Sequence, residues 1–314
     1  MSRLLVTGAA GFLGSHLCDR LLADGHEVIG MDNRVSGQME NLNDAFENSL
    51  FRFHDHDVTE FIHVSGELDA VLHLASLASP VFYRDHPIKT LKVGALGTHK
   101  TLGLAREKDA TYLFTSTSEV YGDPEVNPQP EDYRGNVDSY GPRSCYDESK
   151  RYGESLVRAY RDKHNLDVRV ARIFNTYGPR MRLDDGRVIP NFMKQALTQQ
   201  DLTVYGDGSQ TRSFCHVDDM IEGLATLLES DIQDPVNIGN PDERTIKELA
   251  KLVIEVTKSE SGITYEELPP QDPQVRRPDI SKARSELGWK PGVGLCEGLE
   301  SSVEYFNKQV QELK

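Results

Sequence analysis

Short apolar runs alternate with stretches of helical periodicity through the first half of this chain. After the first run, Leu13, Leu17 and Leu21 recur about one helical turn apart, which predicts an amphipathic helix. The runs themselves are too short for helices and predict buried strands. They are residues 4–6, 27–31, 51–53, 70–74, 112–115 and 168–171. Strands and helices in alternation predict βαβ units, and therefore an α/β fold with a doubly wound parallel sheet.

The second half of the chain is organised differently. Beyond about residue 174 the sequence becomes rich in loops, with a helix expected from Val217 and a strand at residues 236–238. A Pro-rich run at residues 268–270 opens the C-terminal segment. We therefore expect a smaller second lobe beside the sheet, with a cleft between them. The expected ranges are 1–174 for the sheet domain, which also receives parts of 213–240, and 175–314 for most of the second lobe.

The chain is strongly acidic, with a formal net charge of -15 over 314 residues and a pI near 5.1. This balance excludes a nucleic-acid partner, because binding a phosphate backbone needs a basic stripe. An anionic ligand must instead meet particular Arg and Lys side chains within the motifs.

The distribution of cysteines and the absence of a long apolar run near the N-terminus bear on the cellular compartment in which the protein is expected. The four cysteines are scattered without a CxxC pair, which predicts neither a disulfide framework nor a metal site. The first strand follows Met1 almost directly, and no run approaches ~18 apolar residues, so we expect no signal peptide and no membrane partner. These features together predict a cytoplasmic protein.

A glycine-rich turn follows the first predicted strand. Gly8, Gly11 and Gly14 form a GxxGxxG pattern, and Phe12 and Leu13 lie within it. Glycine allows the backbone to approach a pyrophosphate, which the free N–H groups at the start of the next helix then bind. A tight strand-to-helix turn without a ligand is the alternative. The position directly after an N-terminal strand favours dinucleotide binding.

An acidic residue ends the second predicted strand. Asp32 can accept hydrogen bonds from an adenosine ribose, and its charge would repel the 2′-phosphate of NADP, which favours NAD. The nearby Arg34 argues the other way. We place Asn33 in the same site, and Asp57 with Val58 at the adenine edge. An ordinary loop aspartate is the alternative for Asp57.

A tyrosine and a lysine lie four residues apart, at Tyr146 and Lys150. On a helix these positions share one face, and an ammonium group beside a phenol stabilises the phenolate, which lowers the tyrosine pKa. Residues 115–119 follow the fifth predicted strand, so Thr117 and Glu119 would emerge at the carboxyl edge of the sheet, where ligands bind. A surface helix and a simple capping motif are the alternatives for these two patterns taken singly.

Four longer blocks carry a resemblance to a known family. They are STSEVYGDPEV at residues 116–126, YDESKR at 146–151, ARIFNTYGPRM at 171–181 and LTVYGDGSQTR at 202–212. Over nearly its whole length the chain resembles the UDP-glucuronate decarboxylases, within the extended short-chain dehydrogenase/reductase superfamily. The resemblance implies a Rossmann domain that binds NAD, a lobe that binds a UDP-sugar, and a homodimer packed through helices that include the one bearing Tyr146.

The resemblance also implies a role for individual residues. Tyr146 would be the catalytic base and Lys150 its partner, with Thr117, Ser118 and Glu119 lining the reacting sugar carbons. Arg276 would lie at the sugar end and meet the C6 carboxylate of UDP-glucuronate. A surface salt bridge is the alternative for each arginine. The other implied substrate contacts are Lys89, Asn175, Arg187, Tyr205 and Arg212, and the other implied cofactor contacts are Leu74, Ser76 and Thr115.

The reaction implied by the resemblance is a decarboxylation through a 4-keto sugar. Tyr146 would take the proton of the sugar 4-OH while the C4 hydride passes to NAD. The C6 carboxylate is then β to a ketone, so CO2 leaves and its bonding electrons are held as an enolate. Protonation at C5, managed by Glu119 or by a water that it orients, and return of the hydride would give UDP-xylose with NAD regenerated.

Other functions stay open at this point. A nucleotide-sugar 4,6-dehydratase shares the first oxidation, but the dTDP-glucose type carries Asp where this chain has Ser118. The GDP-mannose type resembles this chain in its Ser but uses NADP, against which Asp32 argues. A 4-epimerase would not need Glu119. A non-catalytic NAD-sensing protein of the same fold is disfavoured because Thr117, Tyr146 and Lys150 are all retained.

Overall fold

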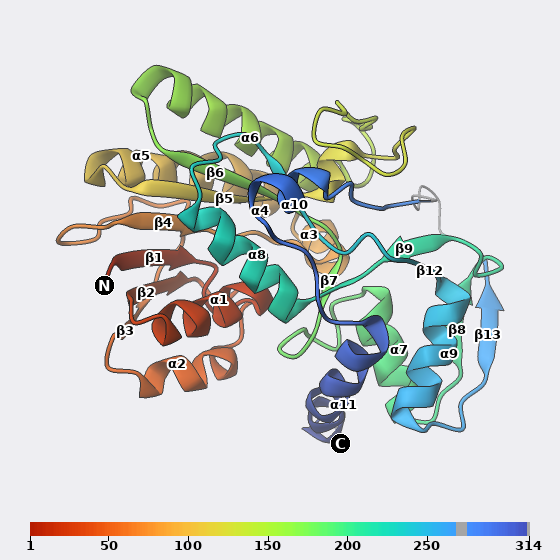
Figure 1. Ribbon diagram of the computed structural model, residues 1–314. Coiled ribbons are helices and arrows are strands. Elements are labelled where there is room, and N and C mark those ends of the chain that lie inside the picture. The colour runs from red at the N-terminus through yellow and green to blue at the C-terminus, as the bar shows by residue number, and fades with distance from the viewer. Residues whose placement is uncertain (268–274, 313–314) are drawn as a thin grey trace.

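The computed structural model describes residues 1–267 and 275–312, so the Pro-rich run at 268–270 lies outside the described residues. Its centre is a seven-stranded parallel sheet in the order β11-β6-β5-β4-β1-β2-β3 (Figure 1). The predicted α/β fold with a doubly wound parallel sheet is confirmed. The strands are β1 (Arg3–Thr7), β2 (Glu27–Asp32), β3 (Phe51–Asp55), β4 (Ala70–His73), β5 (Thr111–Thr117), β6 (Val168–Ile173) and β11 (Val236–Ile238).

The strand order reverses beside β1. The chain runs outward from β1 through β2 to β3, then crosses over to start again at β4 on the other side of β1. Loops leaving the carboxyl ends of β1 and β4 therefore diverge and leave a crevice between them. The cofactor and the reacting groups are expected at this crevice.

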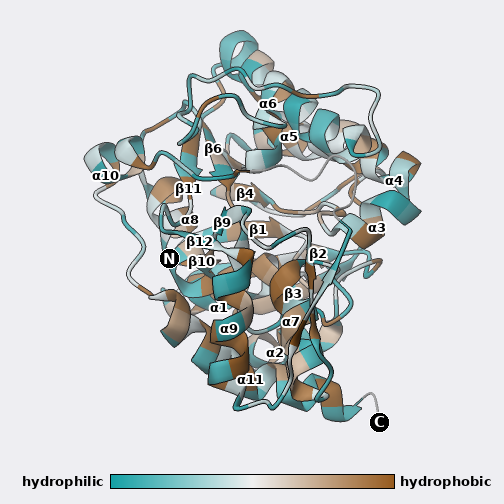
Figure 2. Ribbon diagram, turned by 90° about the vertical axis from the view of Figure 1, so that its right-hand side faces the viewer, coloured by the Kyte–Doolittle hydropathy of each residue, from teal (hydrophilic) through white to brown (hydrophobic). Residues whose placement is uncertain are grey.

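Helices cover both faces of the sheet, which explains why the strands are apolar on both sides. Leu4 and Val6 pack with α1 (Phe12–Ala23) and α8 (Val217–Glu229) on one face. Leu5, between them, faces the opposite layer, made by α5 (Thr98–Lys108) and α6 (Ser144–His164). Hydrophilic residues lie on the outer turns of α6 (Figure 2).

A second lobe packs beside the sheet domain, to its right in Figure 1. Phe192, Leu249 and Phe306 belong to its core, and a capping box between Thr245 and Glu248 starts helix α9. Its helices are α7 (Val188–Leu197), α9 (Ile246–Thr257) and α11 (Leu295–Glu312). Its strands form the pairs β8 (Leu202–Tyr205) with β13 (Ile263–Glu266), β9 (Thr211–Ser213) with β12 (Glu243–Thr245), and β7 (Thr176–Tyr177) with β10 (Cys215–His216).

The chain crosses between the lobes more than once. Helix α8 and strand β11 return to the sheet domain, and so does α10 (Ser281–Glu286), where Ala283 and Trp289 enter the same core as Leu4. No pattern in the sequence predicted that α10 packs against the sheet domain. The division near residue 174 stays a prediction.

The remaining elements of the described chain are short. They are η1 (Met39–Leu42), α2 (Asn43–Glu47), α3 (Pro80–Asp85), α4 (Pro87–Lys92), the π-helical turn η2 (Val93–Gly97) and η3 (Ser118–Tyr121).

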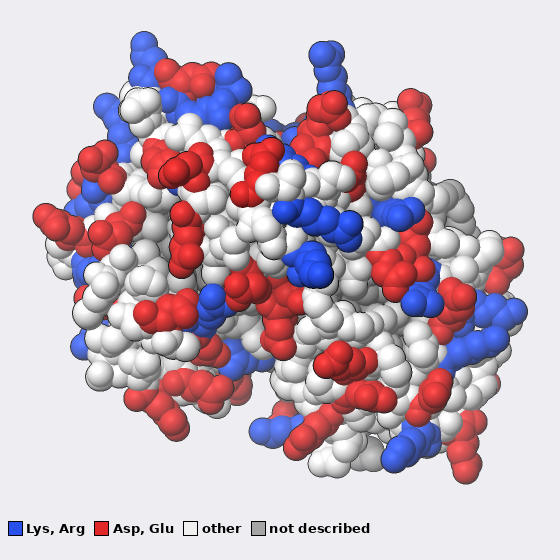
Figure 3. Space-filling model, viewed as in Figure 1, with Lys and Arg blue, Asp and Glu red and all other residues white. Residues whose placement is uncertain are grey.

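Three surface and composition features bear on function. Acidic side chains are spread among basic ones over the face shown in Figure 3. Within residues 1–267 and 275–312, no helix has the length and apolar content needed to cross a membrane. The same residues contain no cluster of His, Cys, Asp and Glu that could hold a metal ion.

Candidate active site

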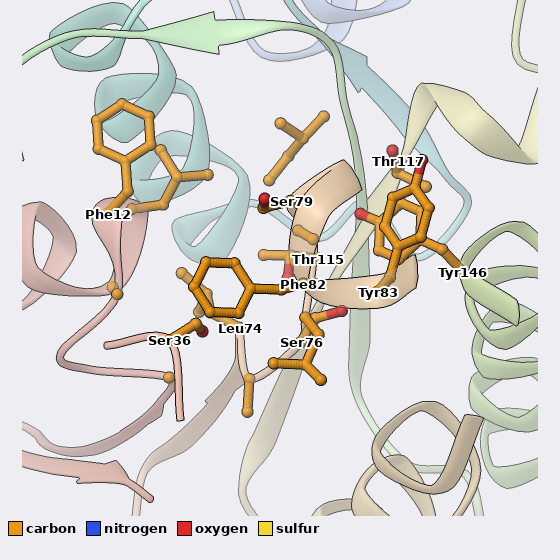
Figure 4. A pocket seen from close by; sticks show the side chains of 18 of the residues that line it. Phe12, Ser36, Leu74, Ser76, Ser79, Phe82, Tyr83, Thr115, Thr117 and Tyr146 are labelled. Carbon is orange, nitrogen blue, oxygen red and sulfur yellow. The ribbon is translucent and has the colours of Figure 1, made fainter. Parts of the chain in front are cut away.

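A cleft lies at the carboxyl ends of the central strands and extends towards the second lobe. In the close-up, Phe12 and Ser36 lie towards one end, and Thr117 and Tyr146 lie towards the other (Figure 4). The cleft brings together residues that are far apart in the sequence. Of the predicted site residues, those that line it are Gly8, Gly11, Phe12, Leu13, Gly14, Asp32, Asn33, Val58, Leu74, Ser76, Lys89, Thr115, Thr117, Ser118, Glu119, Tyr146, Lys150, Asn175 and Arg187.

Four predicted site residues do not line the cleft. Asp57 lies just behind Asn33, and Arg276 is buried behind Glu119. Tyr205 ends β8 with 42% of its surface exposed, and Arg212 lies in β9 of the second lobe. The predicted substrate contacts of Tyr205 and Arg212 therefore find no support in this arrangement, and both stay predictions.

The glycine turn between β1 and α1 has no room for side chains. Gly8 has a φ of +73°, a left-handed conformation that favours glycine, and its N–H donates to the Met31 carbonyl at 2.8 Å. A Cβ at Gly14 would lie 2.0 Å from the Gly8 carbonyl oxygen. The N-cap residue of α1 is Gly11, so no side chain caps the first N–H groups of the helix, and residues 11–14 line the cleft. These features fit a pyrophosphate group.

Asp32 is fixed at the end of β2. Its carboxylate accepts hydrogen bonds from the Ala10 N–H at 3.1 Å and the Arg34 N–H at 2.7 Å. Burial raises the pKa of Asp32, and these two hydrogen bonds oppose the rise. The Arg34 side chain turns away and pairs with Asp55 at the surface. Arg34 could have favoured NADP by pairing with its 2′-phosphate, but its side chain pairs with Asp55 instead.

Asn33 and Asp57 form a small polar contact beside Asp32. The Asn33 amide donates to Asp57 Oδ2 at 2.9 Å, and the hydroxyl and N–H of Thr59 donate to Asp57 Oδ1. Although burial favours the neutral acid, the hydrogen bonds from Thr59 and Asn33 hold the pKa of Asp57 below its usual value. Asp57 thus positions Asn33, which lines the cleft.

Tyr146 is almost fully buried on α6. Its ring stacks on the ring of Tyr83 with 5.3 Å between centroids and an angle of 9°. Burial raises the pKa of Tyr146, and the charge of Arg187 and the side chain of Thr117 act in the opposite direction. The sequence led us to expect a lowered pKa. The direction differs because burial removes the phenol from water, which disfavours the charged phenolate.

Lys150 lies one turn further along the same helix. Its Nζ donates to the Thr115 carbonyl at 2.7 Å and lies 5.9 Å from the centre of the Tyr146 ring. Burial lowers the pKa of Lys150 to about 8, while the charge of Glu154 acts to raise it. The predicted pairing of Tyr146 and Lys150 on one face of a helix is present, and both side chains line the cleft.

Glu154 on α6 connects the carboxyl ends of β5 and β6 to that helix through a hydrogen bond and a half-buried ion pair. Glu154 accepts from the Ser116 hydroxyl at 2.5 Å and pairs with Arg172 on β6 through two hydrogen bonds. Because Ser116 faces α6, its neighbours Thr115 and Thr117 turn towards the cleft. This explains why the strand end presents hydroxyl groups beside Tyr146.

Glu119 is held between two arginines. One carboxylate oxygen bonds to Arg143 and the other to Arg276. Burial alone would raise its pKa, but the charges of Arg276 and Arg143 lower the pKa of Glu119 to about 2. Glu119 is therefore a carboxylate at neutral pH.

Some residues of the cleft were missed by the sequence analysis. Arg143 is three positions before Tyr146, one helical turn away, which is a signal that could have been used. Tyr83 and Asp185 lie on loops and short helices whose packing no local pattern predicts. Both carry a buried oxygen without a hydrogen-bond partner among the described residues.

Known sequences resemble this chain over nearly its whole length. Residues 5–302 match the family model described as GDP-mannose 4,6 dehydratase. UDP-glucuronic acid decarboxylase 1 of Danio rerio is 50% identical over 98% of this chain and 73% of its own length. UDP-glucuronic acid decarboxylase 6 of Arabidopsis thaliana is 52% identical over 97% of this chain and 88% of its own length.

Solved structures with the same fold include two sugar-nucleotide epimerases. UDP-glucose 4-epimerase from Thermotoga maritima with UDP-glucose has a TM-score of 0.91 and 30% identity, covering 99% of this chain and 100% of that one. UDP-glucuronic acid 4-epimerase from Bacillus cereus with UDP-glucuronic acid and NAD has a TM-score of 0.86 and 28% identity, covering 99% and 100%.

Proposed function

The chain belongs to the UDP-glucuronic acid decarboxylases, within the NAD-dependent epimerase/dehydratase superfamily, and we propose that it converts UDP-glucuronate to UDP-xylose and CO2. The observation that carries this proposal is a cleft in which Thr117, Tyr146 and Lys150 stand beside a cavity-facing arginine, Arg143. The first three residues suit oxidation of a sugar hydroxyl, and the arginine suits a uronate.

NAD fits the end of the cleft formed by β1 and β2. The pyrophosphate would lie on the N–H groups after Gly11, and Asp32 would accept from the adenosine ribose. A Cβ at Gly14 would collide with the Gly8 backbone, and a turn without side chains allows a pyrophosphate to approach the main chain closely. When bound there, NAD would accept a hydride from C4 of the sugar and later return it, so that the cofactor is not consumed.

Tyr146 would move the proton of the sugar 4-OH. Thr117, beside it, would orient the same oxygen, and Lys150 would stabilise the phenolate from one helical turn away. The stack on Tyr83 fixes the plane of the phenol ring. Burial raises the pKa of Tyr146, so we infer that nearby positive charge, from the Lys150 ammonium and from NAD when it is bound, would make Tyr146 an effective base.

The uronate carboxylate needs a cationic partner. The sequence suggested Arg276, but this side chain is buried behind Glu119, whereas Arg143 reaches the cleft. We therefore propose that Arg143 meets the carboxylate and that Arg276 acts through Glu119. A hexose without the carboxylate would not supply this second anionic contact to Arg143, so we expect it to be a poorer substrate than the uronate.

Glu119 has a positioning role in this scheme. In the 4-keto form of the sugar, the bond between C5 and C6 breaks, CO2 leaves, and the electrons stay as an enolate that must be protonated at C5. Glu119 stays ionised because two arginines hold it, so it does not carry this proton itself. Of the two alternatives that the sequence left, a water oriented by Glu119 is the one that the geometry favours.

Incubation with a panel of sugar nucleotides tests the proposal. We expect CO2 and UDP-xylose from UDP-glucuronate, and no loss of water from UDP-glucose or dTDP-glucose. A 4-keto-6-deoxy product from a hexose nucleotide, without CO2 from the uronate, would establish a dehydratase instead. UDP-galacturonate as the product would establish a 4-epimerase, and bound NAD that no sugar nucleotide reduces would establish a non-catalytic protein.

We further propose a homodimer through the outer face of α4, η2 and α6. This face exposes Ile88, Leu91, Leu96 and Tyr152, which are 44–71% accessible in the single chain. Apolar side chains gathered on adjacent helices are typical of a surface that a partner covers. Light scattering of the purified protein tests this, and Ile88→Glu should shift a dimer towards monomer while a monomeric wild type would reject the proposal.

A further inference from the structure

Four charged side chains meet behind the sugar end of the cleft. Glu119 comes from η3, Arg143 and Asp147 come from the start of α6, and Arg276 comes from the segment after residue 274. All four are buried or nearly so. The cluster thus holds two positive and up to two negative charges away from water.

The carboxylates of Glu119 and Asp147 differ in the number of hydrogen bonds and ion pairs that they receive. Glu119 takes a hydrogen bond from each arginine, one to each oxygen. Asp147 has only a distant ion pair, 4.0 Å from Oδ2 to Arg143 Nε, and its Oδ1 is buried without a hydrogen-bond partner among the described residues. Asp147 is therefore the anion that the cluster stabilises least.

Several groups from other elements face Asp147. Glu119 and Arg276 act on it from η3 and from the C-terminal segment, and Tyr83 lies near it on α3. On its own helix, the charged neighbours are Arg143 and Glu148. Burial and the charge of Glu119 outweigh the two arginines and raise the pKa of Asp147 to about 7.

The reaction itself requires a proton. Decarboxylation breaks the bond between C5 and C6 and leaves its electron pair on the sugar, and a new C5–H bond replaces it. The sum is a carboxylate plus one proton giving a C–H bond and CO2. A site that binds the carboxylate therefore gains a negative charge at binding. The departure of CO2 moves that charge from the carboxylate to the enolate, and protonation at C5 then removes it.

We propose that Asp147 takes up one proton when the substrate carboxylate binds at Arg143, and gives up that proton after CO2 has left. With Asp147 ionised, the occupied cluster would hold three anions against two cations. With Asp147 neutral, the charges balance at two against two, and Arg143 is free to serve the substrate. Asp147 does not line the cleft, so it is a positioning residue that acts through Arg143. This inference rests on the proposed function.

Titration calorimetry measures the uptake of protons directly. We would bind UDP-glucuronate to the Tyr146→Phe protein, which should not turn over, in buffers of different ionisation enthalpy at about pH 7.5. Both ligands are bound to this same variant, so any effect of the replacement on the charge of the site cancels in the comparison. The comparison ligand is UDP-xylose, which lacks the carboxylate.

We expect UDP-glucuronate to bind with uptake of about half a proton or more per site, and UDP-xylose with little or none. Adding Asp147→Asn should abolish the uptake. Adding Glu148→Gln should leave most of the uptake in place, because this side chain is 36% exposed and its charge acts on Asp147 less than those of Glu119, Arg143 and Arg276. Equal uptake with both ligands, or uptake that persists in the Asn variant, would overturn the proposal.

The pH dependence of turnover gives a second measurement that does not depend on the folding of a variant. In wild type, KM for UDP-glucuronate should rise above pH ~7 by up to about tenfold per pH unit, while kcat changes less. Asp147→Asn, or Asp147→Ser if Asn does not fold, should flatten this rise. A flat KM in wild type that still releases CO2 would reject the role of Asp147 alone, whereas absence of CO2 would reject the proposed function.

Discussion

Replacing Gly14 with Ala should damage the proposed cofactor site and the fold together. The new Cβ would lie 2.0 Å from the Gly8 carbonyl oxygen and 2.8 Å from the Gly8 carbonyl carbon, where ordinary contact begins near 3.4 Å. Both atoms are backbone, so no flexible side chain can turn away. Overpacking of this kind costs about 1–3 kcal/mol, from which the helical preference of Ala over Gly recovers about 0.5–1 kcal/mol. A contact of 2.0 Å lies at the severe end of such overpacking, so we expect a net loss of about 2–2.5 kcal/mol in the free energy of unfolding.

Two other glycines provide a graded series. At Gly11 the nearest atom would be 3.1 Å from the new Cβ, so Gly11→Ala should cost less than Gly14→Ala. At Gly103, inside α5, a Cβ meets nothing within 4 Å. Gly103→Ala should therefore stabilise the protein by about 0.5–1 kcal/mol and leave NAD binding unchanged.

Urea unfolding and the amount of NAD retained on purification measure the two effects. Gly14→Ala should lose most of the bound NAD, because opening the turn moves the N–H groups at the start of α1. The reasoning would be refuted if Gly14→Ala kept wild-type stability and wild-type NAD content, or if Gly103→Ala proved as harmful as Gly14→Ala.

Three further predictions concern single side chains. Tyr146→Phe should keep its stack on Tyr83 and its bound NAD but lose decarboxylation by roughly 100-fold or more, measured as CO2 release, and turnover at the wild-type rate would remove Tyr146 from the mechanism. Asp32→Ala should weaken NAD binding and reduce the discrimination against NADP, and an unchanged preference in a titration of both cofactors would contradict the assignment. Since the pKa of Glu119 is about 2 in the folded protein, below its ordinary value, its ionised form contributes stability that is complete above about pH 4.5 and is lost as the pH falls towards 2. The stability advantage of wild type over Glu119→Gln should therefore shrink by up to about 3 kcal/mol between pH 5 and 2 in denaturant unfolding, and a constant difference would show that Glu119 is not held as predicted.

Local patterns were sufficient for the architecture and for part of the site. The apolar runs predicted the strands of the central sheet to within two residues at each end, because a strand buried on both faces leaves a direct trace in the sequence. The turn at Gly8 and Gly14 and the pair Tyr146 and Lys150 were also found, since each depends on residues within about two helical turns of one another. Helix α10 packing back onto the sheet domain left no such trace.

The charge cluster required the tertiary structure. Glu119 meets Arg143 and Arg276, which lie 24 and 157 positions away, and no spacing rule connects them. The sequence could place Arg276 at the sugar end only through resemblance, and the structure buries it behind Glu119 and brings Arg143 to the cleft.

The sequence by itself determined the sheet, the glycine turn after β1 and the placement of Tyr146 and Lys150 on one face of a helix, because these follow from backbone periodicity and from neighbours on one element. Only the tertiary structure decided which ionisable groups are buried and which are paired. It raised the pKa of Tyr146, lowered that of Glu119, and left Asp147 without a full partner. These pKa shifts depend on how far each group is removed from water and on the distances between charged groups from different segments. The order of residues along the chain does not specify either quantity.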